Sequence, residues 1–259
     1  MAEPVSGTGF SRQLPVETNA DPDEVARFSA LADEWWDPDG SFKPLHRLNP
    51  ARLGFIRDQL ARRFGRDIAT RQPFDGLTIL DIGCGGGLVC EPLSRLGAKV
   101  TGIDASERNI GTARTHAEDM GLHIEYRHMT AENLVEQDAQ FDCVLSLEVI
   151  EHVPDINRFL ASCGALVKPG GALILSTLNR TAKSFLFGKV AAEYVLGWVP
   201  RGTHQWKRFV RPSEISAGLR GSKLRISDIS GLSYDLKFGE WSVGRDVSVN
   251  YMVFAEKNE

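Results

Sequence analysis

Short apolar runs alternate with amphipathic stretches along the chain from about residue 79 onward. The apolar runs are rich in aliphatic and β-branched residues, which indicates buried strands, and the segments between them have the spacing of helices. This alternation is typical of an α/β fold with a doubly wound, mostly parallel sheet that carries helices on both faces. We expect seven strands, at residues 79–82, 99–103, 124–127, 141–147, 172–176, 224–229 and 248–255.

The rest of the chain divides around this sheet. Residues 1–20 are rich in Ser, Thr, Pro, Gly and Ala and lack the apolar core of a signal peptide, so we expect a disordered arm. Asp21 and Pro22 are residue types preferred at a helix N-cap and first turn, which predicts a helix start. We expect one domain over residues 21–259, made of a helical cap (21–75), a cofactor-binding core (76–178), an insertion (179–211) and the final strands (212–259).

Composition narrows the class of protein. With 259 residues, of which 42% are hydrophobic, the chain is able to bury the core of one globular domain. The formal charge of -4 gives no general attraction to nucleic acid, so we expect no nucleic-acid partner. The four cysteines form no Cys-x-x-Cys pair, which indicates buried thiols in a reducing compartment. No apolar run is long enough to predict a membrane span.

A glycine-rich loop directly follows the first strand. Residues 83–87 read Gly-Cys-Gly-Gly-Gly, and we expect a ligand to approach the main chain where Gly83 and Gly85 carry no Cβ. The dinucleotide fingerprint Gly-x-Gly-x-x-Gly would need a glycine at Leu88, so the loop departs from a pyrophosphate site. Asp81 would repel a pyrophosphate but attract the sulfonium and ammonium charges of S-adenosylmethionine. The loop favours S-adenosylmethionine over NAD, with a purely structural turn as the alternative.

Further candidates for cofactor binding follow other strands. Asp104 ends the second strand about twenty residues after the loop, where an acid accepts the hydroxyls of a ribose. In an open α/β sheet, ligands bind outside the carboxyl ends of the strands. Gly83, Asp104 and Leu147 all fall at such ends, and residues 130–132 are placed to line an adenine.

Two acids and a histidine follow the fourth strand. If a helical turn begins here, Glu148, Glu151 and His152 stand at positions i, i+3 and i+4 and point to one side. Carboxylates and an imidazole on one face suit either a Mg²⁺ site with open positions or a general base. The alternative is a hydrogen-bonded rim without chemistry, in a turn that Pro154 ends.

The insertion at residues 179–211 is basic, although the whole chain is acidic. It holds seven basic residues and one acidic residue, a local charge of +6. Six of its apolar residues fall on one helical stripe, whereas Phe185, Leu186 and Leu196 lie off it. A basic helix with such a stripe suits the surface of an anionic membrane. The alternative is a lid that packs over the substrate pocket. The basic residues are Arg180, Lys183, Lys189, Arg201, Lys207, Arg208 and Arg211, and the stripe consists of Phe187, Val190, Ala191, Tyr194, Val195 and Trp198.

These motifs resemble two nested families. The glycine loop with its strand, the strand end at Asp104 and the Lys-Pro-Gly-Gly turn at residues 168–171 are similar to the Rossmann-like class I S-adenosylmethionine-dependent methyltransferases. More specifically, the chain resembles the ubiquinone-biosynthesis O-methyltransferase family over nearly all of residues 23–255. The motifs that carry this second resemblance lie at residues 35–37, 42–50, 148–154, 176–180, 200–204 and 246–252.

The second resemblance implies a reaction and a place in the cell. It implies O-methylation of polyprenylated catechol intermediates, namely 2-polyprenyl-6-hydroxyphenol and 3-demethylubiquinol, at both O-methylation steps of ubiquinone biosynthesis. It also implies a bacterial cytoplasmic enzyme that is peripheral to the inner membrane and associates with a ubiquinone-biosynthesis complex.

The same resemblance implies roles for individual residues. It places Arg52, Gly83, Asp104 and Leu147 around the cofactor; methionine is frequent in the family at the last position, and the exchange conserves volume. In eukaryotic members the residues that match Glu148, Glu151 and His152 hold a divalent metal, which would be Mg²⁺ here.

The expected chemistry follows from the acceptor. A phenol with a pKa of about 10 is a poor nucleophile at neutral pH, so the enzyme has to help remove its proton. A cation held by Glu148, Glu151 and His152 would favour the phenolate; without metal, His152 or a carboxylate would act as the base, with His204 in reserve. Arg52 is suited to bind the cofactor's carboxylate. The alternatives are another small phenolic acceptor, an NAD-linked oxidoreductase, or a non-catalytic, membrane-docked assembly protein.

Overall fold

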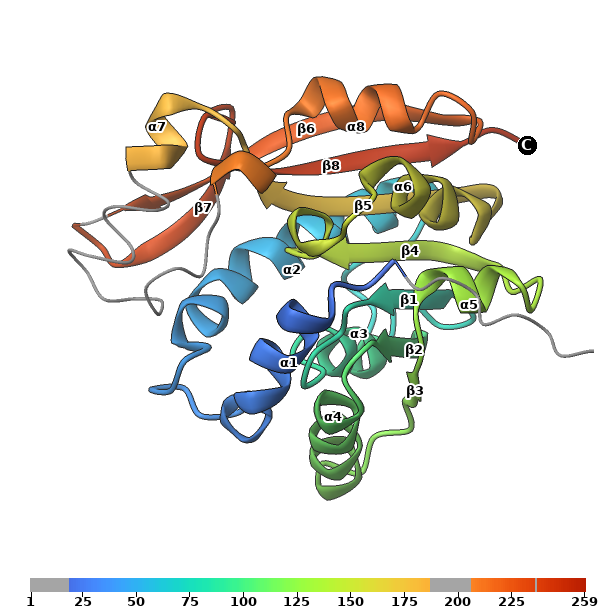
Figure 1. Ribbon diagram of the computed structural model, residues 1–259. Helices are drawn as coiled ribbons and strands as arrows, with labels where there is room; N and C mark the ends of the chain where they lie inside the picture. Colours follow the sequence, from blue (N-terminus) through green and yellow to red (C-terminus); the bar gives the residue numbers. More distant parts are fainter. Residues whose placement is uncertain (1–18, 187–205, 236) are drawn as a thin grey trace, which may run out of the picture.

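A computed structural model describes residues 19–186, 206–235 and 237–259 of the chain. Within them, eight strands form one sheet in the order β3-β2-β1-β4-β5-β8-β6-β7 (Figure 1). The strands are β1 (Thr78–Ile82), β2 (Lys99–Asp104), β3 (Glu125–His128), β4 (Phe141–Leu147), β5 (Val167–Leu178), β6 (Leu224–Asp235), β7 (Glu240–Gly244) and β8 (Asn250–Lys257).

The first five strands are parallel to one another, whereas β8 pairs with β5 and β6 in the antiparallel sense. This agrees with the doubly wound α/β class expected from the sequence. The eighth strand is the difference: β7 was not expected, and β6 extends further than predicted. β7 pairs only with β6 at the sheet edge and leaves most of its residues exposed, so it lacks the apolar run that marks the central strands.

Helices cover both faces of the sheet (Figure 1). The core on one face is built with α2, α3 and α4, and the core on the other face with α5, α6 and α8. The helices are α1 (Pro22–Ala30), α2 (Lys43–Phe64), α3 (Cys90–Arg95), α4 (Glu107–Asp119), α5 (Ala131–Val135), α6 (Ile156–Ala165), α7 (Ala182–Ser184) and α8 (Pro212–Gly218), with short 3-10 turns η1 (Ala32–Glu34), η2 (Ile150–His152) and η4 (Trp206–Arg208).

The helical cap begins where the sequence predicted. The Asp21 side chain accepts a hydrogen bond from the amide of Asp23, and Pro22 opens α1. Of the predicted arm, the structure describes only Asn19 and Ala20. The Asn19 side chain donates to the carbonyl of Asp155 at 2.7 Å and accepts from the Asp155 amide at 2.9 Å. Residues 1–18 and 187–205, including the predicted apolar stripe of the insertion, lie outside the described residues.

A separate small core joins the cap to the glycine loop. It contains Ala32, Trp35, Phe42 and Leu88. The indole of Trp35 is stacked on Phe42 with a centroid distance of 3.7 Å. Because Leu88 directly follows the loop, the cap packs against the segment that was predicted to hold the cofactor.

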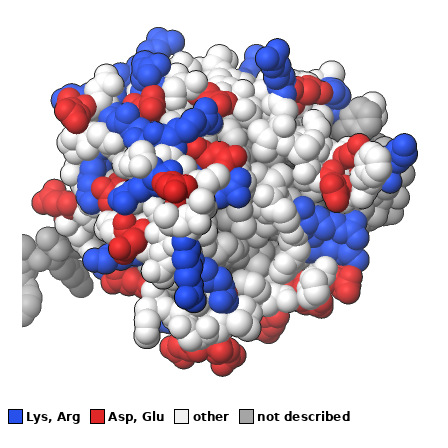
Figure 2. Space-filling view, turned by 180° about the vertical axis from the view of Figure 1, so that it is seen from behind, with Lys and Arg blue, Asp and Glu red and all other residues white. Residues whose placement is uncertain are grey.

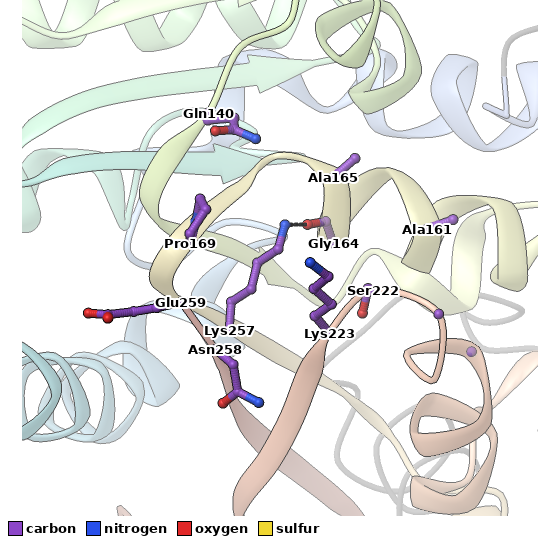
Figure 3. A pocket seen from close by; sticks show the side chains of 12 residues that line it. Gln140, Ala161, Gly164, Ala165, Pro169, Ser222, Lys223, Lys257, Asn258 and Glu259 are labelled. Carbon is purple, nitrogen blue, oxygen red and sulfur yellow. Dashed lines mark hydrogen bonds between the residues drawn. The ribbon is translucent and has the colours of Figure 1, made fainter.

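A cavity of about 490 Å³ lies at the amino edge of β4 and β5, away from the glycine loop (Figure 3). Lys257 contributes to its wall, and its ammonium donates to the carbonyls of Gly164 at 2.8 Å and Val167 at 2.7 Å. Lys257 therefore caps the end of α6, where helix carbonyls lack partners within the helix. Ligands of open α/β sheets bind at the opposite edge, so we do not place the cofactor here.

Charges of both signs are interspersed on the face seen in Figure 2. Lysine and arginine side chains on this face lie among aspartates and glutamates rather than forming one continuous basic stripe. Among the described residues, no helix has both the length and the apolar character needed to cross a membrane.

The first prediction concerns Asp142, which ties three strands together. Its carboxylate accepts hydrogen bonds from the amide and hydroxyl of Thr78 at 2.8 and 2.7 Å, and from Lys168 at 3.0 Å. Burial opposes the charged form, but these partners outweigh it and hold the pKa of Asp142 below its ordinary value of 3.8. Replacement by asparagine should lower the free energy of unfolding at pH 7 by about 1–2 kcal/mol.

The pH dependence gives this prediction a second readout. A lowered pKa stabilises the folded state above the unfolded-state pKa and ceases to do so as the pH falls through the folded-state value. The difference between wild type and Asp142→Asn, measured by urea unfolding, should therefore shrink below about pH 4. Asp75→Asn, at an exposed position, is the matched control. Equal stability of Asp142→Asn and wild type at pH 7 would contradict the assignment.

Candidate active site

The glycine loop requires glycine for its backbone conformation. Gly83, Gly85 and Gly87 have φ angles of 70°, 53° and 89°, in the left-handed region that favours glycine. The amides of Gly83 and Cys84 both donate to the carbonyl of Ile103 at the end of β2, at 2.8 and 3.0 Å. The loop is therefore fastened to the neighbouring strand at its first turn.

The space beside the glycines is used mostly by the protein itself. A Cβ on Gly85 or Gly86 would overlap the side chain of Trp35, and one on Gly83 would overlap Val149. The indole of Trp36 donates to the carbonyl of Gly86 at 2.9 Å. The sequence argument, in which the missing Cβ atoms leave room for a ligand, is therefore incomplete, because here they make room for the cap.

Asp104 lies beside the loop, as predicted. Its carboxylate accepts hydrogen bonds from the amide of Gly85 at 3.0 Å, from the amide of Ser106 at 2.8 Å and from the side chain of Asn109 at 3.2 Å. Burial raises the pKa of Asp104, and the hydrogen bonds from Ser106, Gly85 and Asn109 oppose this shift. These bonds fix the plane of the carboxylate next to the loop, where the hydroxyls of a ribose would be accepted.

Arg52 brings a buried positive charge from α2 to the carboxyl ends of β1 and β4. Its side chain donates to Asn49 at 2.5 Å, and among the described residues its Nε has no hydrogen-bond partner although it is buried. Burial lowers the pKa of Arg52, while the carboxylates of Glu148 and Asp81 raise it. A buried guanidinium with a free N–H fits the carboxylate of the methionine part of S-adenosylmethionine.

Asp81 is more neutral than the sequence suggested. It is 3% exposed, and burial raises its pKa to about 7, against the effects of the Cys90 thiol and Arg52. Cys90 donates to it at 3.2 Å. Its attraction for the positive charges of the cofactor is therefore weaker than the sequence argument assumed.

The backbone turns sharply after Leu147. Leu147 is buried at the end of β4, and Glu148 has a φ angle of 57°, which costs about 1–3 kcal/mol for a residue other than glycine. The amide of Glu148 donates to the carbonyl of Ser176 at 3.0 Å, and its carboxylate accepts from the Ser176 hydroxyl at 2.7 Å. Glu148 is thus held against β5 before the helical turn at residues 150–152 begins.

Glu148 and Glu151 are held by two neighbouring hydroxyls of β5. Glu151 accepts from the hydroxyl of Thr177 at 2.8 Å, whereas Glu148 accepts from the hydroxyl of Ser176 at 2.7 Å. Each carboxylate therefore has its own hydrogen-bond partner on the strand. Burial, followed by the charge of Glu148, raises the pKa of Glu151.

His152 turns toward the cap. Its Nδ1 lies 3.0 Å from a carboxylate oxygen of Glu24 in α1, and Phe28 packs edge-on against its ring at 5.2 Å. Glu24 also pairs with Arg27 at 2.6 Å and with Arg208 at 3.6 Å. A carboxylate on Nδ1 fixes the orientation of an imidazole and leaves Nε2 to face other groups.

The three predicted metal ligands are therefore bound to three different partners. The carboxylates of Glu148 and Glu151 suit Mg²⁺, which prefers oxygen ligands, whereas His152 would supply a nitrogen. Across residues 19–186, 206–235 and 237–259, however, no three side chains of His, Cys, Asp or Glu are gathered so as to hold a metal ion. As placed, these residues do not fit the metal, and we derive no step through it; the predicted metal site stays a prediction.

One further predicted position, Glu132, and three unpredicted residues belong to the candidate site. Glu132, predicted near the adenine, is 7% exposed, and within the described chain its Oε1 is buried without a hydrogen-bond partner. Sequence reasoning missed Glu24, Trp35 and Asn109. The Trp35-Trp36 pair was noted only for its resemblance, and no local pattern marks an asparagine inside a helix as part of a site.

Arg52 gives the second prediction. Arg52→Gln should weaken binding of S-adenosylhomocysteine by about 10- to 100-fold, because hydrogen bonds between charged groups contribute about 1.5–3 kcal/mol. Isothermal titration calorimetry measures this directly. Arg57→Gln, on the same helix but partly exposed and paired with Asp58, should keep the wild-type affinity. If both variants bind like wild type, Arg52 does not hold the cofactor.

Comparison with known proteins shows which family this protein belongs to. The sequence profile of the family described as "Methyltransferase domain" matches residues 80–175. A ubiquinone biosynthesis O-methyltransferase of Maricaulis maris is 55% identical over 92% of this chain and 93% of its own length. Those of Caulobacter vibrioides and Mesorhizobium japonicum are 55% and 52% identical, over 92% and 94% of this chain and 95% and 98% of their own lengths.

Solved structures show the same fold. Magnesium protoporphyrin IX methyltransferase from Synechocystis with bound S-adenosylmethionine superposes with a TM-score of 0.59 at 17% identity, covering 93% of this chain and 100% of that chain. The plantazolicin methyltransferase in complex with S-adenosylhomocysteine gives a TM-score of 0.57 at 19% identity, covering 92% and 97%. These identities speak for the fold alone, but relatives more than half identical over nearly the whole length show that the chain belongs to the ubiquinone biosynthesis O-methyltransferase family, whose methyl donor is S-adenosylmethionine.

Proposed function

We propose that this protein transfers the methyl group of S-adenosylmethionine to a phenolic oxygen of polyprenylated catechols, namely 2-polyprenyl-6-hydroxyphenol and 3-demethylubiquinol. The proposal rests on the match to ubiquinone biosynthesis O-methyltransferases over more than nine tenths of the chain. The site supports it because Glu148, which directly follows Leu147, acts on the charge of Arg52, and Glu151 and His152 follow Glu148 in the same segment and interact with each other. Groups able to take up a proton thus lie next to the proposed cofactor site.

The cofactor is held by groups at the carboxyl edge of the sheet in this proposal. Asp104 accepts the ribose hydroxyls, and Arg52 binds the carboxylate of the methionine part. Gly83, Gly85 and Leu147 shape the wall between them, and Glu132 faces the adenine. The methyl group then points past Leu147, toward the segment that follows β4. Most of the rate acceleration comes from holding the acceptor oxygen in line with the methyl carbon and the departing sulfur.

Proton removal from the phenol is assigned to the segment after β4. His152 is best placed for it, because Glu24 binds its Nδ1 at 3.0 Å and thereby orients the ring. The Nε2 atom then takes the phenolic proton as the oxygen attacks the methyl carbon. Glu148 and Glu151 raise the negative potential around this proton and so favour its transfer to the imidazole.

The third prediction is that His152→Gln lowers turnover of a short-chain catechol analogue by about 10²- to 10⁴-fold, the usual contribution of a positioned acid–base group. Binding of S-adenosylhomocysteine should stay unchanged, because His152 faces the acceptor and not the cofactor. His123→Gln, at an exposed position, is the control and should retain full activity. Wild-type turnover in His152→Gln would remove this residue from the mechanism.

The same assay separates the two versions of proton removal. Full wild-type activity in EDTA would leave His152 as the base and reject the metal version. Activity that is lost in EDTA and restored by Mg²⁺ would instead establish Glu148, Glu151 and His152 as ligands, which would require their side chains to regroup.

We also propose that residues 179–211 dock the enzyme on an anionic membrane surface, from which a polyprenyl chain is delivered. The sequence gives this segment its charge of +6 and its apolar stripe. Part of that charge is neutralised: Arg180 pairs with Glu214, Lys183 with Asp246 at 2.5 Å and Arg208 with Asp21 at 3.1 Å. The proposal therefore assigns the attraction to lipid to other basic residues of the segment, among them Lys189 and Arg201, which lie outside the described residues. Association with other enzymes of ubiquinone biosynthesis at that surface is part of the same proposal.

The fourth prediction tests this docking. The double variant Lys189→Gln, Arg201→Gln should bind vesicles that contain phosphatidylglycerol about 10- to 30-fold more weakly, because each basic residue near such a surface contributes about 1 kcal/mol. Co-sedimentation measures the binding, with pure phosphatidylcholine vesicles as the uncharged comparison. Lys99→Gln, Lys223→Gln carries the same change of charge at exposed positions elsewhere. Equal loss in both double variants would show a general charge effect and sink the docking proposal.

A further inference from the structure

A chain of hydrogen bonds runs from the helical cap to the acid beside the glycine loop. The indole Nε1 of Trp35 donates to Oδ1 of Asn109 at 3.0 Å, and Nδ2 of Asn109 donates to Oδ1 of Asp104 at 3.2 Å. The chain joins residues that are far apart in sequence: Trp35 follows η1, Asn109 lies in the first turn of α4, and Asp104 ends β2.

The chemistry of the three groups allows only one orientation of the middle one. An indole N–H is a donor without acceptor capacity, and a carboxylate only accepts. The amide of Asn109 therefore has to turn its oxygen toward Trp35 and its nitrogen toward Asp104. Asn109 is 2% exposed, so water does not compete for either contact. The order of donors along the chain is fixed by its two ends.

Trp35 is itself held firmly. Its ring is 8% exposed, stacks on Phe42 at 3.7 Å and 6°, and fills the space beside Gly85 and Gly86. Moving the indole away from Asn109 would open a gap in the small core between cap and loop. The indole of Trp35 is therefore placed by packing, independently of its hydrogen bond to Asn109.

Asp104 receives three donors, one from the glycine loop and two from the start of α4. Asn109 and the amide of Ser106 both reach Oδ1, and the amide of Gly85 reaches Oδ2. A carboxylate offers about four lone-pair directions, so these donors leave few directions for a ligand. The bond from Asn109 adds a side-chain donor to Oδ1 and so further restricts the rotation of the carboxylate.

We propose that Trp35 and Asn109 are positioning residues that set the orientation of Asp104 for the cofactor's ribose. Through these hydrogen bonds the helical cap takes part in cofactor recognition, although Trp35 itself does not contact the ribose. The inference rests on the proposed role of Asp104 as the ribose-binding acid. It adds two residues to the cofactor site and gives the tryptophan of the cap a chemical role besides packing.

The experiment compares two ligands by calorimetry: S-adenosylhomocysteine and its counterpart with a 2′,3′-dideoxyribose. A residue that orients Asp104 matters only when there are hydroxyls to accept. Trp35→Phe and Asn109→Leu should each weaken the binding of S-adenosylhomocysteine by about 10-fold. The binding of the dideoxy ligand should weaken by less than about 3-fold. The double variant should bind no more weakly than the weaker single variant, because both substitutions break the same chain. Equal loss for both ligands would overturn the proposal.

Trp36→Phe is the matched control from the same motif. Its indole donates to the carbonyl of Gly86 at 2.9 Å, and its ring stacks on His116 at 3.5 Å, so it supports the loop without joining the chain to Asp104. It should weaken both ligands by the same factor. If Trp35→Phe fails to fold, Asn109→Leu tests the same hydrogen bonds at their middle residue.

Asp104→Asn separates this inference from the assignment on which it rests. If this variant also weakens both ligands equally, Asp104 does not bind the ribose and the proposed cofactor site is wrong. If Asp104→Asn discriminates between the ligands while Trp35→Phe and Asn109→Leu do not, the proposed cofactor site is retained. Only the positioning role of Trp35 and Asn109 is then rejected. None of these readouts involves the methyl acceptor, so failure of the catechol proposal would leave them unchanged.

Discussion

Parallel pairing of β1 with both of its neighbours determines where the rest of the site has to lie. Ile82, the last residue of β1, is level with Ile103 of β2 on one side and Ser146 of β4 on the other. The residues that come next are Gly83, Asp104 and Leu147, so this register alone brings the loop, the acid and the end of β4 together. Every other contact of the site, from Arg52 to the cap, is built onto this row.

The same pairing explains which parts of the site could be predicted from the sequence. Strand ends that carry glycine or an acid are visible in a local pattern, and the rules for parallel sheets say that they meet. The position of Asp104 beside the loop could therefore be predicted from the local sequence together with the rule that the carboxyl ends of parallel strands meet. The cofactor predicted from the loop is confirmed by the family, which also sets the NAD alternative aside.

Other features depend on contacts that no local pattern contains. The glycines predicted that a ligand approaches the backbone of the loop, but they did not predict that Trp35 does so. The position of Trp35 depends on the packing of the whole helical cap. The predicted common face of Glu148, Glu151 and His152 assumed one continuous helical turn. The backbone at Glu148 is left-handed and not helical, and Ser176 and Thr177 of β5 each bind one of the two carboxylates. The edge strand β7 escaped notice because an exposed strand has no apolar run to reveal it.

The position of β8 has a consequence for the order in which the sheet is completed. β8 lies between β5 and β6, although β6 and β7 precede it in the chain. During synthesis from the N-terminus, the hairpin of β6 and β7 therefore has no place on the sheet until residues 250–257 have emerged. Until then the edge of β5 is unpaired, and its backbone groups are open to any other extended segment. The half of the sheet that carries β1 to β5 does not depend on residues 250–257, whereas the antiparallel half needs β8 in place before β6 and β7 join the sheet.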